Sequence, residues 1–377
     1  MRALVAISLT ALAVAACGGA GSDDDPGTPW TPDRAATWYA QQSWIVGANF
    51  VPSTAVNQLD MWQAVTFDPT AIDRELGWAA DVGLNSVRVF LHDRLWQQDA
   101  DGLLTRIDQF LTIADSHGIR VMLVLFDGVW DPYPQTGPQP EPRPYIHNSR
   151  WVQSPGAEFL GDPDRLDELQ DYVVGVVDRF ADDPRVVMWD VFNEPDNMNF
   201  ASYRDVELTP ADKTAGALAL LNKAFGWARS VEPSQPLTAG VFFGGWGSPE
   251  DLSPINDFML HESDIVSFHA YFPLDTTSAL VDDLQQYGRP IVCTEYMARG
   301  TGSTFADILP MFNSRDVGAF HWGWVDGKTQ TKYPWSSWTD TVAGEPDPWF
   351  HDVLHPDGSP YDAAELAVIG TLTNTPN

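Results

Sequence analysis

The sequence predicts a single (β/α)₈ barrel, the TIM-barrel fold, on three observations. The chain has 377 residues, of which 44% are hydrophobic, so it can hold a barrel of about 250 residues or more. From about residue 44 onward, eight short apolar runs alternate with amphipathic helical stretches. No internal repeat or second domain is evident in the sequence. Strands alternating with helices in one chain are typical of a parallel sheet, here closed into a barrel.

The eight apolar runs are the predicted strands, and the stretches between them are the predicted helices. The strands cover residues 44–50, 86–91, 119–126, 186–192, 236–242, 264–269, 290–294 and 317–322. The helices cover residues 69–82, 103–117, 165–180, 210–231, 249–261, 278–287, 304–314 and 362–370. Pro69 and Pro210 suit early helical positions, and Gly118 and Gly288 suit helix ends. A doubly wound open sheet is the alternative, but the first predicted strand lacks the Gly-rich turn typical of that fold.

The N-terminus resembles an export signal. A short positive start is followed by an apolar segment, residues 3–13, that is too short for a membrane span. The next four residues, Val14-Ala15-Ala16-Cys17, resemble a bacterial lipobox, in which the cysteine is lipidated. We therefore expect a signal peptide at residues 1–16, a lipidated Cys17 on a flexible tether at 17–36, and a barrel domain at 37–377. An ordinary signal peptide cleaved near Ala16 is the alternative. Either way the protein is exported, and lipidation would anchor it to a membrane on the cell surface or periplasmic side.

Charge and cysteine content limit the possible partners. The formal net charge of −31 gives no basic footprint for nucleic acid. The two cysteines are Cys17 and Cys293, so lipidation of the first leaves no disulfide within the chain. The eight histidines are scattered, and no His-x-His ends the first strand, so we expect neither a metal nor another cofactor. We expect a monomer.

Two glutamates stand where a barrel carries its chemistry, at the carboxyl ends of strands. Glu194 ends the fourth apolar run and Glu295 ends the seventh. Side chains on these two strands face each other across the barrel mouth. Glycoside hydrolysis needs two such carboxyl groups: one protonates the leaving oxygen, and in retaining enzymes the other attacks the anomeric carbon at a separation of about 5–5.5 Å.

The motifs around these glutamates resemble clan A glycoside hydrolases, with family 5, the cellulase-like family, as the best match. Asn193-Glu194-Pro195 resembles the acid/base motif, and residues 291–296 (IVCTEY) resemble the nucleophile strand. Further similarity lies at residues 47–50 (GANF), 85–92 (NSVRVFLH), 267–271 (SFHAY) and 327–331 (GKTQT). These segments are similar to bacterial proteins often labelled 1,4-β-xylanase. The resemblance covers roughly residues 37–370, the catalytic domain.

The resemblance implies a role for each matching residue. Glu194 would be the acid/base and Glu295 the nucleophile of a double-displacement hydrolase acting on β-linked oligo- or polysaccharides. Five side chains would bind the substrate or support the carboxylates: Asn193, Arg88, His269, Tyr271 and Trp322. Cys293 is interpreted as core packing, on the same inward face of its strand as Glu295.

Several candidates and alternatives stay open. Subsite walls or loop packing are both possible for His92, Asp127, Trp130, Trp151, Trp246, Trp324, Lys328 and Gln330. The Pro-rich stretch 127–164 should shape the cleft. The rival functions are a lipid-anchored barrel that binds sugar without catalysis, a transglycosylase with the same site, a metal-dependent hydrolase, and a phosphate-binding barrel using residues 299–303.

Overall fold

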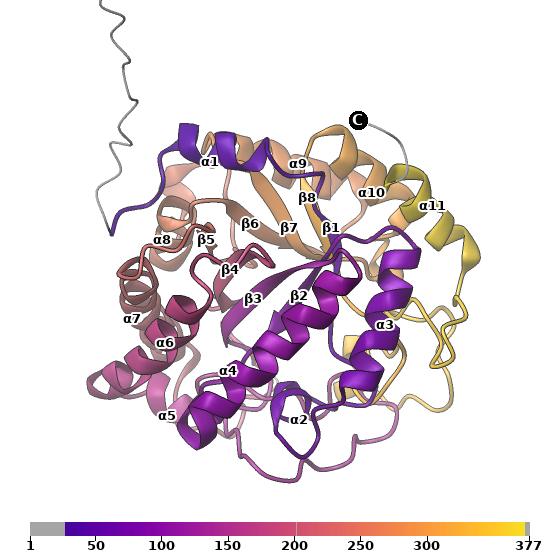
Figure 1. Ribbon diagram of the computed structural model, residues 1–377, viewed down its shortest axis with the longest axis horizontal. Helices are drawn as coiled ribbons and strands as arrows, with labels where there is room; N and C mark the ends of the chain where they lie inside the picture. The colour runs from indigo at the N-terminus through magenta and orange to yellow at the C-terminus, as the bar shows by residue number, and fades with distance from the viewer. Residues whose placement is uncertain (1–26, 201, 374–377) are drawn as a thin grey trace, which may run out of the picture.

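A computed structural model describes residues 27–200 and 202–373, and it confirms the (β/α)₈ barrel. Strands stand at the centre and helices surround them (Figure 1). Within the described residues the eight parallel strands are β1 (Val46–Asn49), β2 (Ser86–Phe90), β3 (Arg120–Asp127), β4 (Val186–Asn193), β5 (Leu237–Thr238), β6 (Val266–Ala270), β7 (Ile291–Tyr296) and β8 (Gly318–His321). Each lies within or next to its predicted run.

The ring closes between β5 and β6 through a short connection. Seven strand pairs form parallel ladders in the order β5-β4-β3-β2-β1-β8-β7-β6. The eighth junction is an isolated parallel bridge between Val241 and Phe268. There the Val241 amide donates to the Ser267 carbonyl at 3.0 Å, and the His269 amide donates to the Val241 carbonyl at 3.1 Å. The carboxyl ends of the eight strands therefore surround one mouth of the barrel.

The predicted helices all form, and several begin at a side-chain cap, as those starting at Pro69, Pro210 and Phe305 do. The α-helices of the described residues are α1 (Pro32–Tyr39), α2 (Gln58–Trp62), α3 (Pro69–Asp81), α4 (Asp93–Ser116), α5 (Ala157–Leu160), α6 (Gln170–Arg179), α7 (Pro210–Arg229), α8 (Pro254–Glu262), α9 (Leu274–Gln285), α10 (Phe305–Ser314) and α11 (Ala363–Thr373). Short 3₁₀ turns add η1 (Pro163–Leu169), η2 (Pro249–Asp251), η3 (Arg299–Thr301) and η4 (Trp335–Trp338). α4 has a break at Asp99, where the backbone is not helical, and the helix predicted from residue 103 is its second part. The first part begins at Asp93, where the His92 ring accepts from the Arg94 amide.

The folded domain begins earlier than the predicted boundary at residue 37. α1 starts at Pro32, inside the predicted tether, and Trp30 is buried with its amide donating to Asp264 at 2.8 Å. The tether prediction is therefore wrong for residues 30–36, because the tryptophan is buried against the barrel. The predicted signal peptide and Cys17 lie outside the described residues. Among the described residues, none of the helices is both long and apolar enough to cross a membrane.

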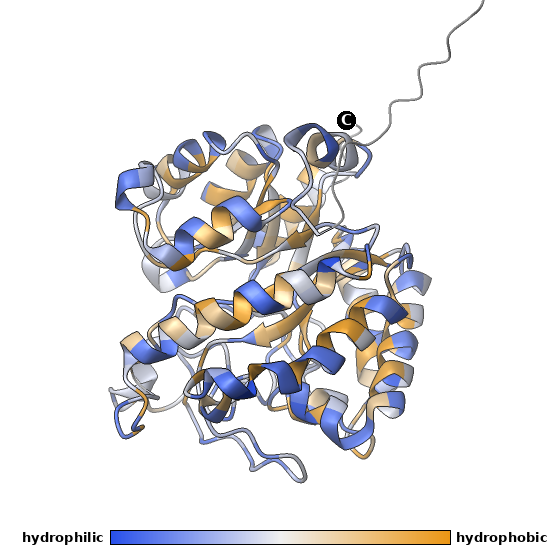
Figure 2. Ribbon diagram, turned by 90° about the vertical axis from the view of Figure 1, so that its left-hand side faces the viewer, coloured by the Kyte–Doolittle hydropathy of each residue, from blue (hydrophilic) through white to orange (hydrophobic). Residues whose placement is uncertain are grey.

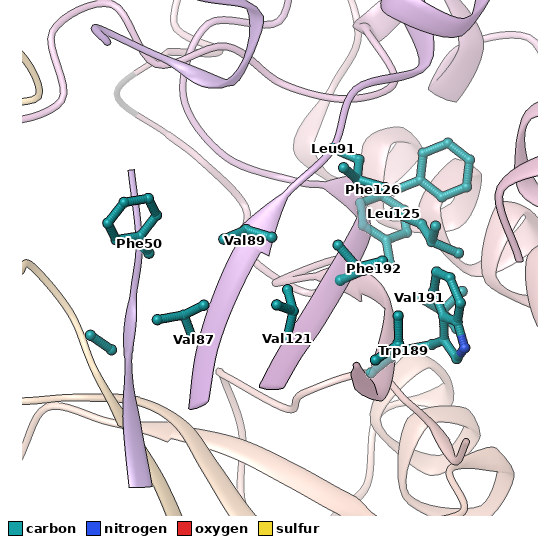
Figure 3. Close-up of a cluster of buried hydrophobic side chains, with 14 of the residues drawn as sticks. Phe50, Val87, Val89, Leu91, Val121, Leu125, Phe126, Trp189, Val191 and Phe192 are labelled. Carbon is teal, nitrogen blue, oxygen red and sulfur yellow. The ribbon is translucent and has the colours of Figure 1, made fainter. Parts of the chain in front are cut away.

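The main core lies between the strands and the helices. Apolar side chains on the outer faces of neighbouring strands form it, including Phe50, Val87, Val121 and Trp189 (Figure 3). The helices turn their hydrophobic faces inward and their hydrophilic faces to solvent (Figure 2). A smaller apolar cluster, which includes Met122, Met188 and Phe320, packs separately from this layer. Layered packing of this kind makes a rigid support for groups at the strand ends.

A β-bulge in β7 sets the direction of Glu295. Phe268 of β6 pairs with Cys293, but His269 pairs with Glu295, so Thr294 is an extra residue in β7. Cys293 packs in the outer core cluster, not in the barrel interior. The prediction that Cys293 and Glu295 share a face is therefore wrong, because the bulge breaks the alternation. Cys293 is fully buried, in agreement with its expected role in core packing.

Candidate active site

The strand ends surround a cavity of about 250 Å³ at the barrel mouth. Its lining includes five of the seven residues predicted to act in catalysis or substrate binding: Asn193, Glu194, Tyr271, Glu295 and Trp322. The other two, Arg88 and His269, are buried beside the carboxylates and contact them directly. The remaining lining residues are Val129, Trp130, His147, Asn148, Asn197, Asn199, Phe200, Phe242 and Trp335.

Glu295 is held by a cation and a hydroxyl. Arg88 Nη1 donates to Glu295 Oε1 at 2.9 Å, and Tyr271 Oη donates to Oε2 at 2.7 Å. Burial raises the pKa of Glu295, whereas the charge of Arg88 and the hydrogen bond from Tyr271 lower it. Both donors favour the ionised carboxylate, which is the form that a nucleophile needs.

Glu194 has a different environment. Its Oε1 lies 2.7 Å from His269 Nδ1, and its Oε2 accepts from Asn197 Nδ2 at 2.7 Å. Burial raises the pKa of Glu194 to about 7, against the hydrogen bond from Asn197 and the charge of Arg88. A carboxyl group with this pKa holds a proton near neutral pH and can donate it, which suits a general acid.

The two carboxyl groups are close enough to act on one bond. One oxygen of Glu194, one oxygen of Glu295 and one nitrogen of His269 all lie within 4.8 Å of one another. Three such atoms could hold a metal ion, but both glutamates already accept hydrogen bonds from other side chains. Burial lowers the pKa of His269 to about 4, so its ring is neutral at pH 7 and adds no charge between the carboxylates.

Arg88 organises the floor of the site from the centre of the barrel. It is fully buried, and Nε and Nη2 both donate to Asp190 Oδ2, at 3.0 and 2.8 Å. Nη1 also donates to Asn49 at 2.7 Å, and Nη2 to Asn193 at 2.6 Å. This spread of donors is a property of the planar guanidinium. The sequence analysis did not select Asp190, although a charged residue inside an apolar run was a signal that a buried partner exists.

Asp127 holds Asn193 from the other side. Its carboxylate accepts from Asn193 Nδ2 at 2.9 Å, from Trp151 Nε1 at 2.6 Å and from Gln58 Nε2 at 3.0 Å. Burial raises the pKa of Asp127 to about 7. Asp127 and Trp151 therefore support the site from behind the cavity lining. Asn197, which bonds to Glu194, was missed because a polar residue in a loop carries no sequence signal of its own.

The other open candidates separate into core and mouth. His92 caps α4, while Trp246 and Trp324 are buried outside the cavity lining. Trp130 lines the cavity, and Gln330 bonds to the loop that carries Trp130. Lys328 is a surface residue with a side chain 41% exposed.

The loop at residues 299–303 is already tied to other parts of the chain. Arg299 donates through Nε to Glu365 at 2.8 Å and through Nη1 to the Trp349 carbonyl at 3.0 Å. These contacts use the cation that a phosphate would need, so they do not favour the phosphate-binding alternative.

Unusual backbone conformations gather at the cavity. Four non-glycine lining residues have positive φ: Trp130 at 67°, Asn148 at 44°, Glu194 at 44° and Asn199 at 48°. Such conformations cost about 1 kcal/mol or more each and are concentrated at functional sites. The backbone at the end of β4 thus turns Glu194 into the cavity at an energetic cost.

The model of the Cellulase (glycosyl hydrolase family 5) family matches residues 60–339, which include both glutamates and every strand from β2 to β8. The chain belongs to glycosyl hydrolase family 5. As a member of this family it is a glycoside hydrolase acting on β-glycosidic bonds. No curated protein sequence matches the chain.

Solved family 5 structures share the barrel at low sequence identity. A variant of GH5_18 from Streptomyces cattleya, in complex with Manβ1-4GlcNAc, has a TM-score of 0.59 and 15% identity, covering 89% of this chain and 82% of that one. The endo-1,4-β-D-mannanase of Thermotoga petrophila gives 0.53 and 14%, with 87% and 99% covered. An exo-β-1,4-mannosidase from an Opitutaceae bacterium gives 0.54 and 18%, with 87% and 59% covered. At these identities the likeness establishes the fold.

Proposed function

We propose that this protein is a retaining β-glycosidase, with Glu194 as the acid/base and Glu295 as the nucleophile. The observation that carries the proposal is the closeness of the two carboxyl groups, since one oxygen of Glu194 lies within 4.8 Å of one oxygen of Glu295. Retaining enzymes need about 5–5.5 Å, whereas inverting enzymes need about 6.5–9.5 Å to admit a water molecule. The different partners of the two glutamates support these roles.

The reaction has two steps. In the first, Glu295 attacks the anomeric carbon while Glu194 gives its proton to the glycosidic oxygen, so the bond to the leaving group breaks and a glycosyl-Glu295 ester forms. In the second, Glu194 takes a proton from water as the water attacks the same carbon and releases Glu295. Asn193, held by Arg88 and Asp127, can donate to a sugar hydroxyl beside the anomeric centre. Trp322 can stack on the sugar ring.

The names of the solved neighbours support a substrate class. The three solved neighbours carry names or ligands with β-1,4-linked mannose, which supports a β-linked oligo- or polysaccharide as substrate. Transfer of the glycosyl group to a sugar instead of water uses the same groups, and product analysis with an added acceptor distinguishes it. A barrel that binds sugar without catalysis is not favoured, because both carboxylates have the partners that catalysis requires.

Chemical rescue tests the two roles. Glu194→Ala should slow hydrolysis of poor leaving groups far more than of activated aryl β-glycosides, and azide should restore turnover as the β-glycosyl azide. Glu295→Ala should abolish hydrolysis of both, with azide giving the α-glycosyl azide. Equal loss on good and poor leaving groups for Glu194→Ala would contradict the acid role.

The location is proposed on sequence grounds. We propose export and anchoring through a lipid on Cys17, supported by the lipobox-like residues 14–17. The catalytic domain would then stand outside the cytoplasm, on the membrane, and act as a monomer on soluble saccharides.

A further inference from the structure

One side of the active-site cavity is closed by two long loops that bond to each other. The loop after β3 contributes residues 143–151 and the loop after β8 contributes residues 327–338; together we call them the loop wall. The Asn148 amide donates to the Thr329 carbonyl at 2.9 Å. Gln330 Nε2 donates to the Arg143 carbonyl at 2.8 Å, and its Oε1 accepts from the Tyr145 amide at 2.9 Å.

Aromatic stacking strengthens the loop wall. Trp338 stacks on Trp130 at 5.0 Å between ring centroids with planes 12° apart, and Trp338 Nε1 donates to the His147 carbonyl at 2.7 Å. The Arg143 guanidinium carbon lies over the Trp338 ring, 4.3 Å from the ring centroid. Because each loop supplies both polar and stacking partners, the two loops hold each other in place beside the cavity.

The loop after β1 joins the loop wall from behind. The Lys328 amide donates to the Ser53 carbonyl at 3.0 Å, and Asn57 Nδ2 donates to the Arg150 carbonyl at 2.8 Å. Between the loop wall and Trp322 lies a second void of only about 20 Å³. A space of this size holds a water molecule but no sugar ring. The substrate cleft therefore does not continue past Trp322 on the side of β1 and β2.

The part of the cavity lining that follows β4 is exposed at Phe200. This residue has 68% of its surface exposed, and the neighbouring Phe243 is 66% exposed. Phe200 follows β4, three residues after the Asn197 that bonds to Glu194, and Phe243 follows β5. His147 and Asn148, at the loop wall, are each 1% exposed. The leaving group departs on the side of the acid, so the leaving group fits the open half and the sugar that bonds to Glu295 fits the closed half.

The closed half also holds an unused hydrogen-bond acceptor. The Oδ1 atom of Asn148 is buried and has no partner among the described residues, although the residue lines the cavity. A buried polar atom without a partner costs about 1–3 kcal/mol, and a ligand hydroxyl would satisfy it. A sugar inside a chain carries its next unit on the hydroxyl that would bond to Asn148, whereas in a terminal sugar this hydroxyl is free.

From this geometry we infer that the enzyme acts from the non-reducing end and releases one sugar at a time, with Asn148 binding a hydroxyl that only the terminal residue has free. The inference rests on the proposed function. The substrates are β-linked oligosaccharides or small β-glycosides whose leaving part lies against Phe200 and Phe242. The internal bonds of a polysaccharide do not fit, because no room exists for a second sugar behind Trp322.

Product analysis on matched substrates tests this inference. The probes are 4-nitrophenyl β-D-glucoside, mannoside, xyloside and galactoside, then the tri- to hexasaccharides of the preferred sugar with and without a 4,6-acetal (a 4-position block for xylose) on the non-reducing unit. We expect monosaccharide as the first product and no cleavage of the blocked compounds. Cleavage of blocked compounds, or early release of longer products, would overturn the inference. If no 4-nitrophenyl glycoside is cleaved, the oligosaccharides of all four sugars are tested: release of longer products from any of them overturns the inference alone, and failure to cleave any probe overturns the proposed function itself.

Two variants link the result to the loop wall. Gln330→Asn keeps a residue that tolerates the positive φ of 57° but is too short to bridge the loop after β3, and it should admit some blocked substrate. Lys328→Ala, on the same loop and outside the cavity lining, is the control and should keep the wild-type products.

Asn148→Gly, which also keeps its backbone, should lower kcat/KM by about 5- to 150-fold. That loss should vanish for the deoxy glycoside that lacks the bound hydroxyl; an equal loss on every deoxy glycoside would refute the role of Asn148.

Discussion

Tyr271→Phe tests how the ionised state of Glu295 is maintained. The substitution removes one hydroxyl and keeps the ring, which packs edge-on against Trp335 at 5.0 Å and His351 at 5.5 Å. The lost contact is the 2.7 Å hydrogen bond to Glu295 Oε2. Because this bond is made to the charged form of the carboxyl group, its loss raises the pKa of Glu295.

The size of the effect follows from the burial of both partners. Tyr271 is 8% exposed and Glu295 is 5% exposed, so little water replaces the hydroxyl. A hydrogen bond to a charged group contributes about 1.5–3 kcal/mol, and 1.36 kcal/mol corresponds to one pKa unit. The pKa of Glu295 should therefore rise by about one to two units. The nucleophile must be ionised. As the pH is lowered, the variant should therefore lose activity at a higher pH than the wild type does.

The assay is the pH dependence of kcat/KM on an activated aryl β-glycoside. The acid limb of Tyr271→Phe should lie about one to two units above that of the wild type, with the alkaline limb in place. Tyr203→Phe is the matched control. It removes a buried hydroxyl that donates to Gln153 Oε1 at 3.0 Å and does not bond to Glu295. It should lower stability by about 0.5–1.5 kcal/mol and leave both limbs unchanged. An unmoved acid limb in Tyr271→Phe would refute the reasoning.

Three further predictions concern the acid, the buried cation and the anchor. Because burial raises the pKa of Glu194 to about 7 and its proposed role as the acid needs the proton, kcat/KM should fall as pH rises through about 7, and Glu194→Gln should lose this alkaline limb on activated substrates; a limb that persists would exclude the assignment. Arg88→Met leaves Asp190 buried without its ion pair and should lower the free energy of unfolding by about 3–5 kcal/mol in urea titrations, whereas a loss below about 1 kcal/mol would show that the pair is dispensable. Cys17→Ser should move the protein from the membrane to the soluble fraction of the producing cells, and an unchanged membrane fraction would argue against lipidation.

The fold could be predicted because hydrophobic periodicity records which faces are buried. The two-residue β5 was overestimated as residues 236–242, since an apolar run records burial and not the length of a hydrogen-bonded ladder. α1 was missed as part of the domain because its capping by Thr31 and the burial of Trp30 depend on contacts with distant residues. Cys293 was misplaced because a bulge leaves no mark in the alternation of residue types.

The site was predictable where a residue ends a strand, and less so in the loops. The strand-end pattern located Glu194 and Glu295, and the family resemblance supplied the residues that contact them. Asn197 and Asn148 lie in loops whose paths are fixed by tertiary contacts, so their approach to the cavity could not be read from spacing. The closed half of the cavity depends on a pairing between residues about 190 apart, such as His147 and Ser337, which no local pattern encodes.

The junction between β5 and β6 is the only one of the described strand junctions formed by an isolated bridge, and it also carries His269, which contacts Glu194. The amide of His269 is one of two hydrogen bonds of the isolated bridge, and its ring reaches Glu194 on β4 while lying 3.5 Å from Glu295. Local opening occurs most readily in regions with few backbone hydrogen bonds. Opening of the junction between β5 and β6 would therefore separate Glu194 from Glu295. A sugar that contacts both glutamates spans the junction and holds it shut. Substrate binding should then slow hydrogen exchange at the amides of Val241 and His269.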